Sequence, residues 1–376
     1  MVYNGSMNIA MIGQKGMVLG ERGGGIERHV AEIATHLVDS GHSVTVYARA
    51  KYAPERPKRL NGVRLVFLPT IYFKHLEAII HTFFSSIHAL FQGYDIIHYH
   101  GVGPATLSWI ARLFARNAKT IVTFHSQDQF HQKWGWFARR YLAFGERAAA
   151  TFPHYCISVS HTIQVYCRET FGREVVYIPN GATPKHVTAT DEIEKFGLER
   201  RGYILNVGRL VPQKGVQYLI EAFKNLETNK RLVIVGAGSF SHVYEQSLKD
   251  LAKNRSDILF LGYQSGEALE QLFAHAYLYV QPSESEGMPV VVLESMSHGV
   301  PPLVSDIPEN MEAMHHAGFS FRNKDVDDLT RQLRFALANS SDVLEKGEEA
   351  QAIIETSFNW KHIAEQTEGV YLSARH

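Results

Sequence analysis

Short apolar runs alternate with amphipathic helical patterns along almost the whole chain. In the first half, the apolar runs predict strands at residues 8–12, 43–47, 95–98, 120–124 and 155–159. After the first run, Ile26, Val30, Ile33 and Leu37 recur at helical spacing, so they predict a helix with one apolar face. Strands that alternate with helices form βαβ units, which build a parallel sheet covered on both faces.

The same alternation begins again in the second half, with strands predicted at residues 203–207, 231–235, 258–261, 277–280 and 302–304. We therefore expect an α/β protein of two tandem, Rossmann-like, doubly wound domains, at residues 7–180 and 202–358. The polar segment 181–201 is interpreted as the interdomain linker and residues 359–376 as a C-terminal helix. Residues 1–6 end in Gly-Ser just before Met7 and are interpreted as an expression scar. Because such sheets bind ligands at the carboxyl ends of their strands, we expect the ligand in an interdomain cleft.

The composition is that of a globular protein, since 45% of the 376 residues are hydrophobic and 20% are charged. Lysine and arginine together number 38, as do aspartate and glutamate, so no overall field favours nucleic acid as a partner. The two cysteines have no metal-type spacing, which fits a reducing cytosol. We see no apolar run long enough to span a membrane and no secretion signal, so we expect a cytoplasmic location.

Glu286 and Glu294 lie eight residues apart, on either side of a Gly-Met-Pro turn. Pro289 suits the first position of a helix, and Gly299 would end that helix. The N-terminus of the helix would offer free N–H groups and a positive dipole end to an anion. Two hydrogen-bond acceptors that flank a phosphate-sized site suit a sugar nucleotide, whose hydroxyls lie on both sides of its diphosphate. The alternative is that both glutamates are solvated surface residues.

Two loops would place backbone N–H groups or positive charge beside such a ligand. The loop 13–25 is rich in glycine and precedes the first predicted helix, but its spacing is not the dinucleotide-binding fingerprint. The loop 208–215 follows the first strand of the second domain and carries Arg209 and Lys214, two residue types that bind phosphate. The alternatives are a flexible loop in the first case and solvated charges in the second.

Histidines gather near the ends of two first-domain strands. His125 follows strand 120–124, where it would hydrogen-bond a substrate hydroxyl or stabilise developing charge, although a structural role is the alternative in a chain with 20 histidines. His98 and His100 share one strand face, but no cysteine or carboxylate stands at metal-ligand spacing, so we expect no metal there. Asp325 and Asp327 resemble a metal-binding pair, yet they precede a helical run and are better explained as N-cap and first-turn charges.

The segment 133–147 is both basic and aromatic. It contains Lys133, Trp134, Trp136, Arg139, Arg140, Tyr141 and Arg147. Together with the apolar run 73–91, it would suit peripheral contact with the inner face of the cell membrane, or with a lipid-linked or polymeric acceptor. An ordinary two-faced helix with buried aromatic side chains is the alternative.

Together these motifs resemble the family 4 glycosyltransferases with the GT-B architecture, from residue 7 to about residue 371. The Glu-x7-Glu segment, the Gly-Arg…Lys-Gly loop and the run 178–181 carry the resemblance most specifically. Residues 11–29 look like those of a bacterial subgroup of surface-polysaccharide glycosyltransferases. The resemblance implies transfer of a sugar from a UDP- or GDP-linked donor to a glycan or lipid-linked acceptor, with retention of the anomeric configuration. It also implies that the C-terminal helix crosses back to the first domain.

The resemblance assigns roles to individual residues. Glu286 matches the glutamate that faces the donor sugar, and Glu294 matches the one that binds the ribose hydroxyls. Arg209 and Lys214 match the pair that neutralises the diphosphate leaving group, and His125 matches a histidine near the reactive face of the sugar. The other donor-binding residues that the resemblance implies are Gly24, Gly25, Asn180, Gly208, Gly262, Gly287, Met288 and Pro289.

The chain departs from the family pattern at two places. Met288-Pro289 replaces a frequent Phe-Gly, and Ser126 replaces a frequent glycine after the histidine, so both departures bear on donor identity rather than on activity. The implied route is same-face attack, in which the leaving phosphate helps to deprotonate the acceptor while Arg209 and Lys214 do the work of a metal ion. We therefore expect no cofactor and no metal. A nucleotide-sugar epimerase and a non-catalytic nucleotide-sugar-binding subunit of the same fold are the alternatives.

Overall fold

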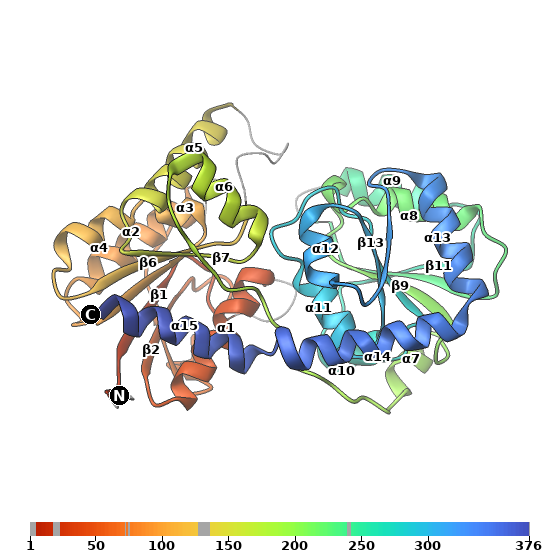
Figure 1. The fold of residues 1–376 in the computed structure, drawn as a ribbon, viewed down its shortest axis with the longest axis horizontal. Helices are drawn as coiled ribbons and strands as arrows, with labels where there is room; N and C mark the ends of the chain where they lie inside the picture. The colour runs from red at the N-terminus through yellow and green to blue at the C-terminus, as the bar shows by residue number, and fades with distance from the viewer. Residues whose placement is uncertain are drawn as a thin grey trace. The chain divides into compact units, whose positions relative to one another are not determined.

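The computed structural model describes residues 5–17, 23–71, 73, 76–126, 136–238 and 242–375, with only the backbone for residues 136–139 and 242. The chain folds into two compact units, and each unit has its own hydrophobic core (Figure 1). The first unit comprises residues 1–180 and 360–376, and the second unit comprises residues 181–359.

The described part of the first unit is built on an eight-stranded sheet in the order β3-β4-β2-β1-β5-β6-β7-β8. Neighbouring strands are parallel except for β3 and β4. The strands are β1 (Asn8–Ile12), β2 (Ser43–Ala48), β3 (Arg59–Leu60), β4 (Val63–Phe67), β5 (Ile96–His100), β6 (Lys119–Phe124), β7 (Tyr155–Ser158) and β8 (Val176–Tyr177). All five strands expected from the sequence are present, whereas β3, β4 and β8 were not expected.

Helices cover both faces of this sheet. α1 and α15 lie on one face, and the helices from α2 to α6 lie on the other (Figure 1). The helices are α1 (Gly25–Asp39), α2 (Glu77–Ala89), α3 (Val102–Ala105), α4 (Ser108–Phe114), α5 (Trp136–Thr151), α6 (His161–Phe171) and α15 (Trp360–Arg375). The central strands β1, β2, β5, β6 and β7 are therefore almost wholly buried, as expected for parallel strands covered on both faces.

The described part of the second unit has a six-stranded, fully parallel sheet in the order β11-β10-β9-β12-β13-β14. The strands are β9 (Tyr203–Val207), β10 (Arg231–Val235), β11 (Ile258–Gly262), β12 (Leu278–Gln281), β13 (Pro302–Ser305) and β14 (Phe319–Phe321). The helices are α7 (Asp191–Lys195), α8 (Val216–Lys224), α9 (His242–Leu251), α10 (Gly266–Ala274), α11 (Val290–Ser297), α12 (Pro308–Met314), α13 (Val326–Ala338) and α14 (Ser340–Ser357). α8, α9 and α13 pack on one face of the sheet, and α10, α11, α12 and α14 pack on the other (Figure 1).

The last helix, α15, is part of the first unit although it follows the second unit in the sequence. Ile363 and Tyr371 of this helix are buried in the core that β1 and α1 form. Trp360, its first residue, is also buried and lies edge-on to His29 of α1, with ring centres 5.7 Å apart. The core of the first unit is therefore completed by the C-terminal end of the chain.

Two segments of the second unit bear on expectations from the sequence. Residues 181–201, expected as a linker, belong to the second unit and contain α7, whose Ile193 is buried beside α10. Asp325 is the N-cap of α13, because its carboxylate accepts a hydrogen bond from the Asp328 N–H at 2.9 Å, and Asp327 lies in the first turn. This confirms the capping role expected for the Asp325 and Asp327 pair.

Two glycines let backbone segments meet closely at the edge where β9, β10 and β12 end. Gly215 has a φ of +66°, and a Cβ built on it would lie 1.9 Å from the Pro282 carbonyl oxygen. Gly236 has a φ of +140°, and a Cβ there would lie 1.8 Å from the Gly208 carbonyl oxygen. The loops that follow the three strands are therefore in direct backbone contact, which any larger residue would disrupt.

We predict that Gly215→Ala destabilises the protein much more than Gly262→Ala. Gly262 is a matched control, because its φ is +65° but no heavy atom lies within 4 Å of the position that a Cβ would take there. The left-handed backbone alone costs about 1 kcal/mol in Gly262→Ala, and the clash with Pro282 adds at least about 2 kcal/mol in Gly215→Ala. Urea titration of both variants measures the two free energies of unfolding. Equal losses would show that the Pro282 carbonyl does not restrict this position.

Candidate functional site

The loops that follow β9 and β12 bring together two of the charged residues expected at the site. β9 and β12 are neighbouring parallel strands, so both loops leave the sheet at the same edge. The loop 208–215 makes a 3₁₀ turn at Pro212–Lys214 before α8 begins, and the loop 282–289 leads into α11. Lys214 and Glu286, 72 residues apart in the sequence, therefore meet at this edge.

Lys214 and Glu286 form a largely buried ion pair. Lys214 Nζ lies 2.5 Å from Glu286 Oε1, and the two side chains are 16% and 11% exposed. Gln281 Nε2 donates a hydrogen bond to the same carboxylate oxygen at 2.7 Å and another to Ser283 Oγ at 2.8 Å. The side-chain carbonyl of Gln281 accepts in turn from the Tyr279 hydroxyl. Charge and hydrogen bonds from both loops thus converge on Glu286.

These contacts keep Glu286 ionised. Burial by itself raises the pKa of the Glu286 carboxyl, but the Lys214 ammonium and the hydrogen bonds from neighbouring side chains outweigh burial and hold this pKa below its usual value. The pKa of Tyr279 lies well above its usual value, first because of burial and then because of the negative charges of Glu286 and Glu294. At neutral pH the cluster therefore contains a carboxylate, an ammonium and an uncharged phenol.

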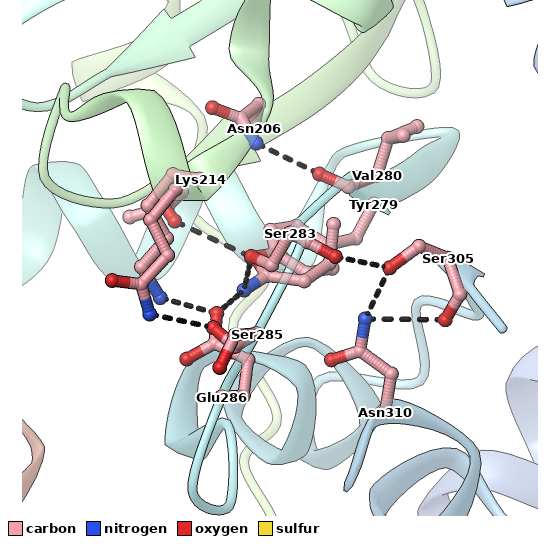
Figure 2. A network of polar contacts seen from close by, with 12 residues as sticks. Asn206, Lys214, Tyr279, Val280, Ser283, Ser285, Glu286, Ser305 and Asn310 are labelled. Carbon is pink, nitrogen blue, oxygen red and sulfur yellow. Dashed lines mark hydrogen bonds and ion pairs between the residues drawn. The ribbon is translucent and has the colours of Figure 1, made fainter. Parts of the chain in front are cut away.

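Further hydrogen bonds join the two loops and anchor them to the sheet. Gln213 Nε2 donates to the Ser285 carbonyl at 2.7 Å, which ties the loop after β9 to the loop after β12. Ser305 Oγ, at the end of β13, donates to the Ser283 carbonyl and accepts from Asn310 Nδ2 at 2.9 Å (Figure 2). The positions of Lys214 and Glu286 are therefore set by the backbone around them, which is the preorganisation that a charged binding site requires.

Arg209 is placed differently from Lys214. Its side chain is exposed, and it makes no hydrogen bond or ion pair with any residue that the structure describes. A solvated guanidinium turns toward an anion at little cost, whereas the Lys214 ammonium must share its carboxylate partner to do so. The two cations expected to act together thus differ, since Lys214 already forms an ion pair and the Arg209 side chain is solvated.

The remaining predicted residues of the second unit lie on α11, in the turn before it, and at the ends of β9 and β11. Glu294 lies half-buried on α11, and Met288, in the turn before the helix, is buried while Gly287 is half-buried. Pro289, expected as the first helical residue, is instead the N-cap of α11, because its ψ of 95° is extended. Gly208 follows β9 and Gly262 ends β11, the two strands on either side of β10. The Gly208 N–H donates to the Val235 carbonyl at the end of β10, and the Gly262 carbonyl accepts from the Gly236 N–H.

In the first unit, His125 packs with three other buried histidines of the described chain. His29 lies on α1, His98 and His100 lie on β5, and His125 follows β6 directly. His100 Nδ1 is 3.3 Å from His125 Nε2, and the ring centre of His29 is 4.8 Å from that of His125. His98 and His100 share one face of β5, as the sequence predicts, with ring centres 4.1 Å apart.

All four imidazoles are uncharged at neutral pH. Burial lowers the pKa of His29 to about 4 and the pKa of His98 to about 3. The pKa values of His100 and His125 lie well below the ordinary value, first because of burial and then because of the neighbouring histidines. His125 therefore offers a hydrogen-bond donor or acceptor to a substrate, and not a positive charge.

Two of the four histidines are held by polar side chains from distant segments. His29 Nδ1 lies 2.9 Å from Asn180 Oδ1, so the amide of Asn180, expected to bind the donor, contacts His29. His98 Nδ1 lies 2.7 Å from the Tyr371 hydroxyl, and His98 Nε2 lies 2.7 Å from Thr123 Oγ1. The orientations of these two rings are fixed by their partners.

The glycine-rich loop of the first unit is described in part. Gly24 is the N-cap of α1 and Gly25 is its first residue, and both are exposed. Glu27 Oε1 accepts a hydrogen bond from the Lys15 N–H at 3.0 Å, which ties the loop after β1 to α1. Residues 18–22 of the loop, and Gln127 and Asp128 after the histidine, lie outside the described residues.

The sequence did not single out Gln281, Ser283 or His29 for a role. A signal exists for the first two, because the apolar run of β12 ends at the polar Gln281, and Ser283 follows two residues later at the sheet edge where ligands bind. His29 belongs to the segment 11–29 that carries part of the family resemblance. Its partner Asn180 is 151 residues away, so no local sequence pattern predicts that contact.

Two family models match the chain one after the other. The model described as Glycosyltransferase Family 4 matches residues 23–186, and the model described as Glycosyl transferases group 1 matches residues 189–360. Two units in series, each with a parallel-stranded Rossmann-like sheet, define a protein of the GT-B class. The chain belongs to the family 4 glycosyltransferases, which confirms the fold class and the family expected from the sequence.

Relatives cover most of the chain. An uncharacterized glycosyltransferase of Methanocaldococcus jannaschii is 27% identical, over 93% of this chain and 94% of its own length. An Escherichia coli UDP-Gal:alpha-D-GlcNAc-diphosphoundecaprenol alpha-1,3-galactosyltransferase is 27% identical, over 73% of this chain and 74% of its own length. The structure of Anabaena HepE in complex with UDP and glucose has a TM-score of 0.81 at 20% identity, and the match covers 98% of this chain and 100% of that one. This last likeness concerns the fold alone.

The lowered pKa of Glu286 predicts how stability depends on pH. A carboxyl whose pKa is lower in the folded chain stabilises the fold above its unfolded pKa, and this stabilisation is lost as the pH falls through the folded pKa. We expect the wild type to be more stable than Glu286→Gln at neutral pH, with a difference that shrinks below about pH 4. Urea titrations of both proteins at several pH values measure the difference. A difference that stayed constant with pH would mean that the charge of Glu286 contributes nothing to folding.

Proposed function

We propose that this protein is a retaining glycosyltransferase that moves a sugar from a nucleotide-diphosphate donor to a hydroxyl of a glycan or lipid-linked acceptor, in cell-surface polysaccharide or glycoconjugate biosynthesis. The observation that carries the proposal is the Lys214–Glu286 pair at the ends of β9 and β12, with Gln281 on the same carboxylate. The pair offers a cation to a diphosphate and, beside it, an acceptor to a sugar hydroxyl.

In this proposal the protein positions the reactants and stabilises charge, without a covalent intermediate. The acceptor oxygen bonds to the anomeric carbon as the bond from that carbon to the phosphate oxygen breaks. The acceptor proton passes to the departing phosphate on the same face of the sugar. Because negative charge on the diphosphate increases along this path, Lys214 and Arg209 stabilise the transition state more than the ground state. Glu286, which stays ionised, accepts from a sugar hydroxyl while it shares the Lys214 ammonium with the phosphate.

The relatives support the substrate classes. The name of the E. coli relative specifies UDP-Gal as donor and a diphosphoundecaprenol-linked sugar as acceptor, and the HepE structure contains UDP and glucose. We extend a nucleotide-sugar donor and a lipid-linked acceptor to this chain on the basis of shared family membership. We also propose that transfer needs no metal ion, since Lys214 and Arg209 supply positive charge, and that it occurs in the cytoplasm, where the two buried, unpaired cysteines are stable.

We predict that Lys214→Ala lowers kcat by at least about tenfold, because the departing diphosphate loses the charge that stabilises it. Release of nucleoside diphosphate from UDP- and GDP-linked sugars, in the presence of a lipid-linked acceptor, measures the rate. Lys324→Ala is the matched control, because Lys324 forms an ion pair with Glu284, 2.8 Å away and close to Glu286 in the sequence.

An unchanged kcat in Lys214→Ala would refute the assignment of Lys214. Activity that EDTA abolishes and Mn²⁺ restores would refute metal independence. Conversion of the donor without any acceptor would indicate an epimerase instead of a transferase.

We further propose that the first unit contacts an anionic membrane surface through α2, α4 and α5. These helices pack together on one face of the sheet. Their exposed apolar side chains include Phe83, Phe84, Leu113, Phe114 and Phe144. Exposed arginines accompany them on α4, α5 and the loop after α4, namely Arg112, Arg116, Arg140 and Arg147. Apolar side chains beside cations suit the interface of an anionic bilayer.

Two further facts concern this surface. No helix within the described ranges has the length and apolar character needed to cross a bilayer. Of the basic aromatic segment expected to take part, Lys133 and Trp134 and the side chains of Trp136 and Arg139 lie outside what the structure describes, and Tyr141 bonds through its hydroxyl to Thr106 at 2.6 Å.

Co-sedimentation with anionic vesicles at low salt tests the membrane contact. We expect the wild type to sediment with phosphatidylglycerol vesicles and the double variant Leu113→Glu/Phe114→Glu to stay in solution. The two carboxylates would replace apolar side chains at the bilayer surface and would be repelled by the anionic lipid. Val243→Glu in the second unit is the control, since Val243 is also apolar and exposed. Failure of the wild type to bind the vesicles would refute the proposed membrane contact and would not bear on the proposed transfer reaction.

A further inference from the structure

His29, His100 and His125 form a compact set of nitrogen ligands inside the first unit. One ring nitrogen from each residue lies within 4.8 Å of the other two. The three side chains come from three different elements and are 2%, 1% and 8% exposed. The sequence alone placed only His98 and His100 together, and with two imidazoles it gave no reason to expect a metal.

The bond between His29 and Asn180 prepares His29 to bind a metal. Asn180 Oδ1 can only accept, so the His29 Nδ1 that lies 2.9 Å from it carries the proton. Nε2 of His29 is then unprotonated and offers its lone pair. A histidine whose second nitrogen donates to an oxygen is the usual form of a metal ligand, because the bond fixes the tautomer and the ring orientation.

His100 and His125 already stand at ligand spacing. His100 Nδ1 and His125 Nε2 are 3.3 Å apart. A tetrahedral Zn²⁺ with Zn–N bonds of about 2.0–2.1 Å places its ligand nitrogens about 3.4 Å from one another. His100 Nε2 is buried and has no hydrogen-bond partner within the described chain. The ring is held through Nδ1 by His125, and a metal bound to both rings would take the place of that contact.

His98 is close to the set but is not a member of it. Both of its ring nitrogens are taken, one by the Tyr371 hydroxyl and the other by Thr123 Oγ1, each at 2.7 Å. Its ring lies against that of His100 and so limits the movement of that ring. The cluster thus contains three candidate metal ligands, His29, His100 and His125, and one further histidine, His98, that packs against His100.

We propose that His29, His100 and His125 form a binding site for Zn²⁺ or a similar divalent transition metal. Three neutral imidazoles suit Zn²⁺, Ni²⁺ and Cu²⁺ and do not suit Mg²⁺ or Mn²⁺, which prefer oxygen ligands. The three nitrogens lie within 4.8 Å of one another, so the rings must move closer to reach the spacing of about 3.4 Å that a tetrahedral Zn²⁺ requires.

The metal site opposes catalysis, a consequence that rests on the proposed function. The family resemblance implies that His125 lies near the reactive face of the donor sugar, and a histidine whose nitrogen binds a metal is no longer available for a contact with that sugar. The metal-free protein is the active form, and the zinc-loaded protein loses transfer activity. The site therefore makes the enzyme sensitive to free transition metal while its chemistry needs none.

Metal binding is measured first, without donor or acceptor. Chelator-treated wild type is titrated with Zn²⁺ by calorimetry, and Co²⁺ is substituted so that its visible spectrum and X-ray absorption report the number of imidazole ligands. We expect one metal per chain with three imidazoles. His29→Gln and His100→Gln each weaken binding by at least about tenfold, whereas His36→Gln, a second histidine on α1, leaves it unchanged.

The wild-type absorption data keep the test valid even if a variant fails to fold. Absence of stoichiometric binding, fewer than three imidazoles around Co²⁺, or equal affinity in His29→Gln and His36→Gln would overturn the proposed site. Inhibition is measured second: Zn²⁺ should abolish transfer by the wild type and EDTA should restore it. Stoichiometric binding by a protein with no transferase activity would overturn the proposed function and leave the metal site intact, whereas full activity of the zinc-loaded protein would overturn only the inhibitory role.

Discussion

The ion pair between Lys214 and Glu286 is the interaction on which the candidate site of the second unit depends. Burial of either charge costs free energy, and removal of one partner leaves the other largely desolvated without an opposite charge beside it. Gln281, Ser283 and the backbone bonds between the two loops hold the pair at the edge where β9 and β12 end. The fold thus holds the Lys214 ammonium in place without a ligand, because its partner is the Glu286 carboxylate and not water. In the proposed function, a diphosphate at this edge would meet a charge already in position, and the reorganisation needed in solution would be avoided.

How far the sequence predicts this arrangement depends on the range of each contact. β9 and β10 could be predicted to the residue because four of the five residues in each are apolar. β3 has only two residues, Arg59 and Leu60, both exposed, and no pattern can mark so short an edge strand. Lys214 and Glu286 could each be placed at the end of a strand, but their contact could not be predicted, because it requires that β9 lie next to β12 in the sheet.

The histidine cluster shows the same limit in another form. The alternation along β5 predicts that His98 and His100 share a face, since side chains two apart in a strand point the same way. His29 and His125 reach that face from α1 and from the end of β6, and only the order β1-β5-β6 in the sheet makes this possible. The imidazoles of the cluster are uncharged because burial, and then the neighbouring imidazoles, disfavour the positively charged form of each ring. The site in the first unit is therefore polar but neutral, in contrast to the ionised pair in the second unit.

The return of α15 to the first unit has a mechanical consequence. The chain passes between the units twice, near residue 180 and near residue 360. On one side of the crossings Ala182 is bridged to Asn359, and the Ala182 N–H donates to the Phe358 carbonyl at 2.7 Å. On the other side Asn180 and Trp360 both contact His29. The two crossings are therefore joined to each other on the second-unit side and meet at a common histidine on the first-unit side, so the two stretches of chain that link the units are not independent of one another.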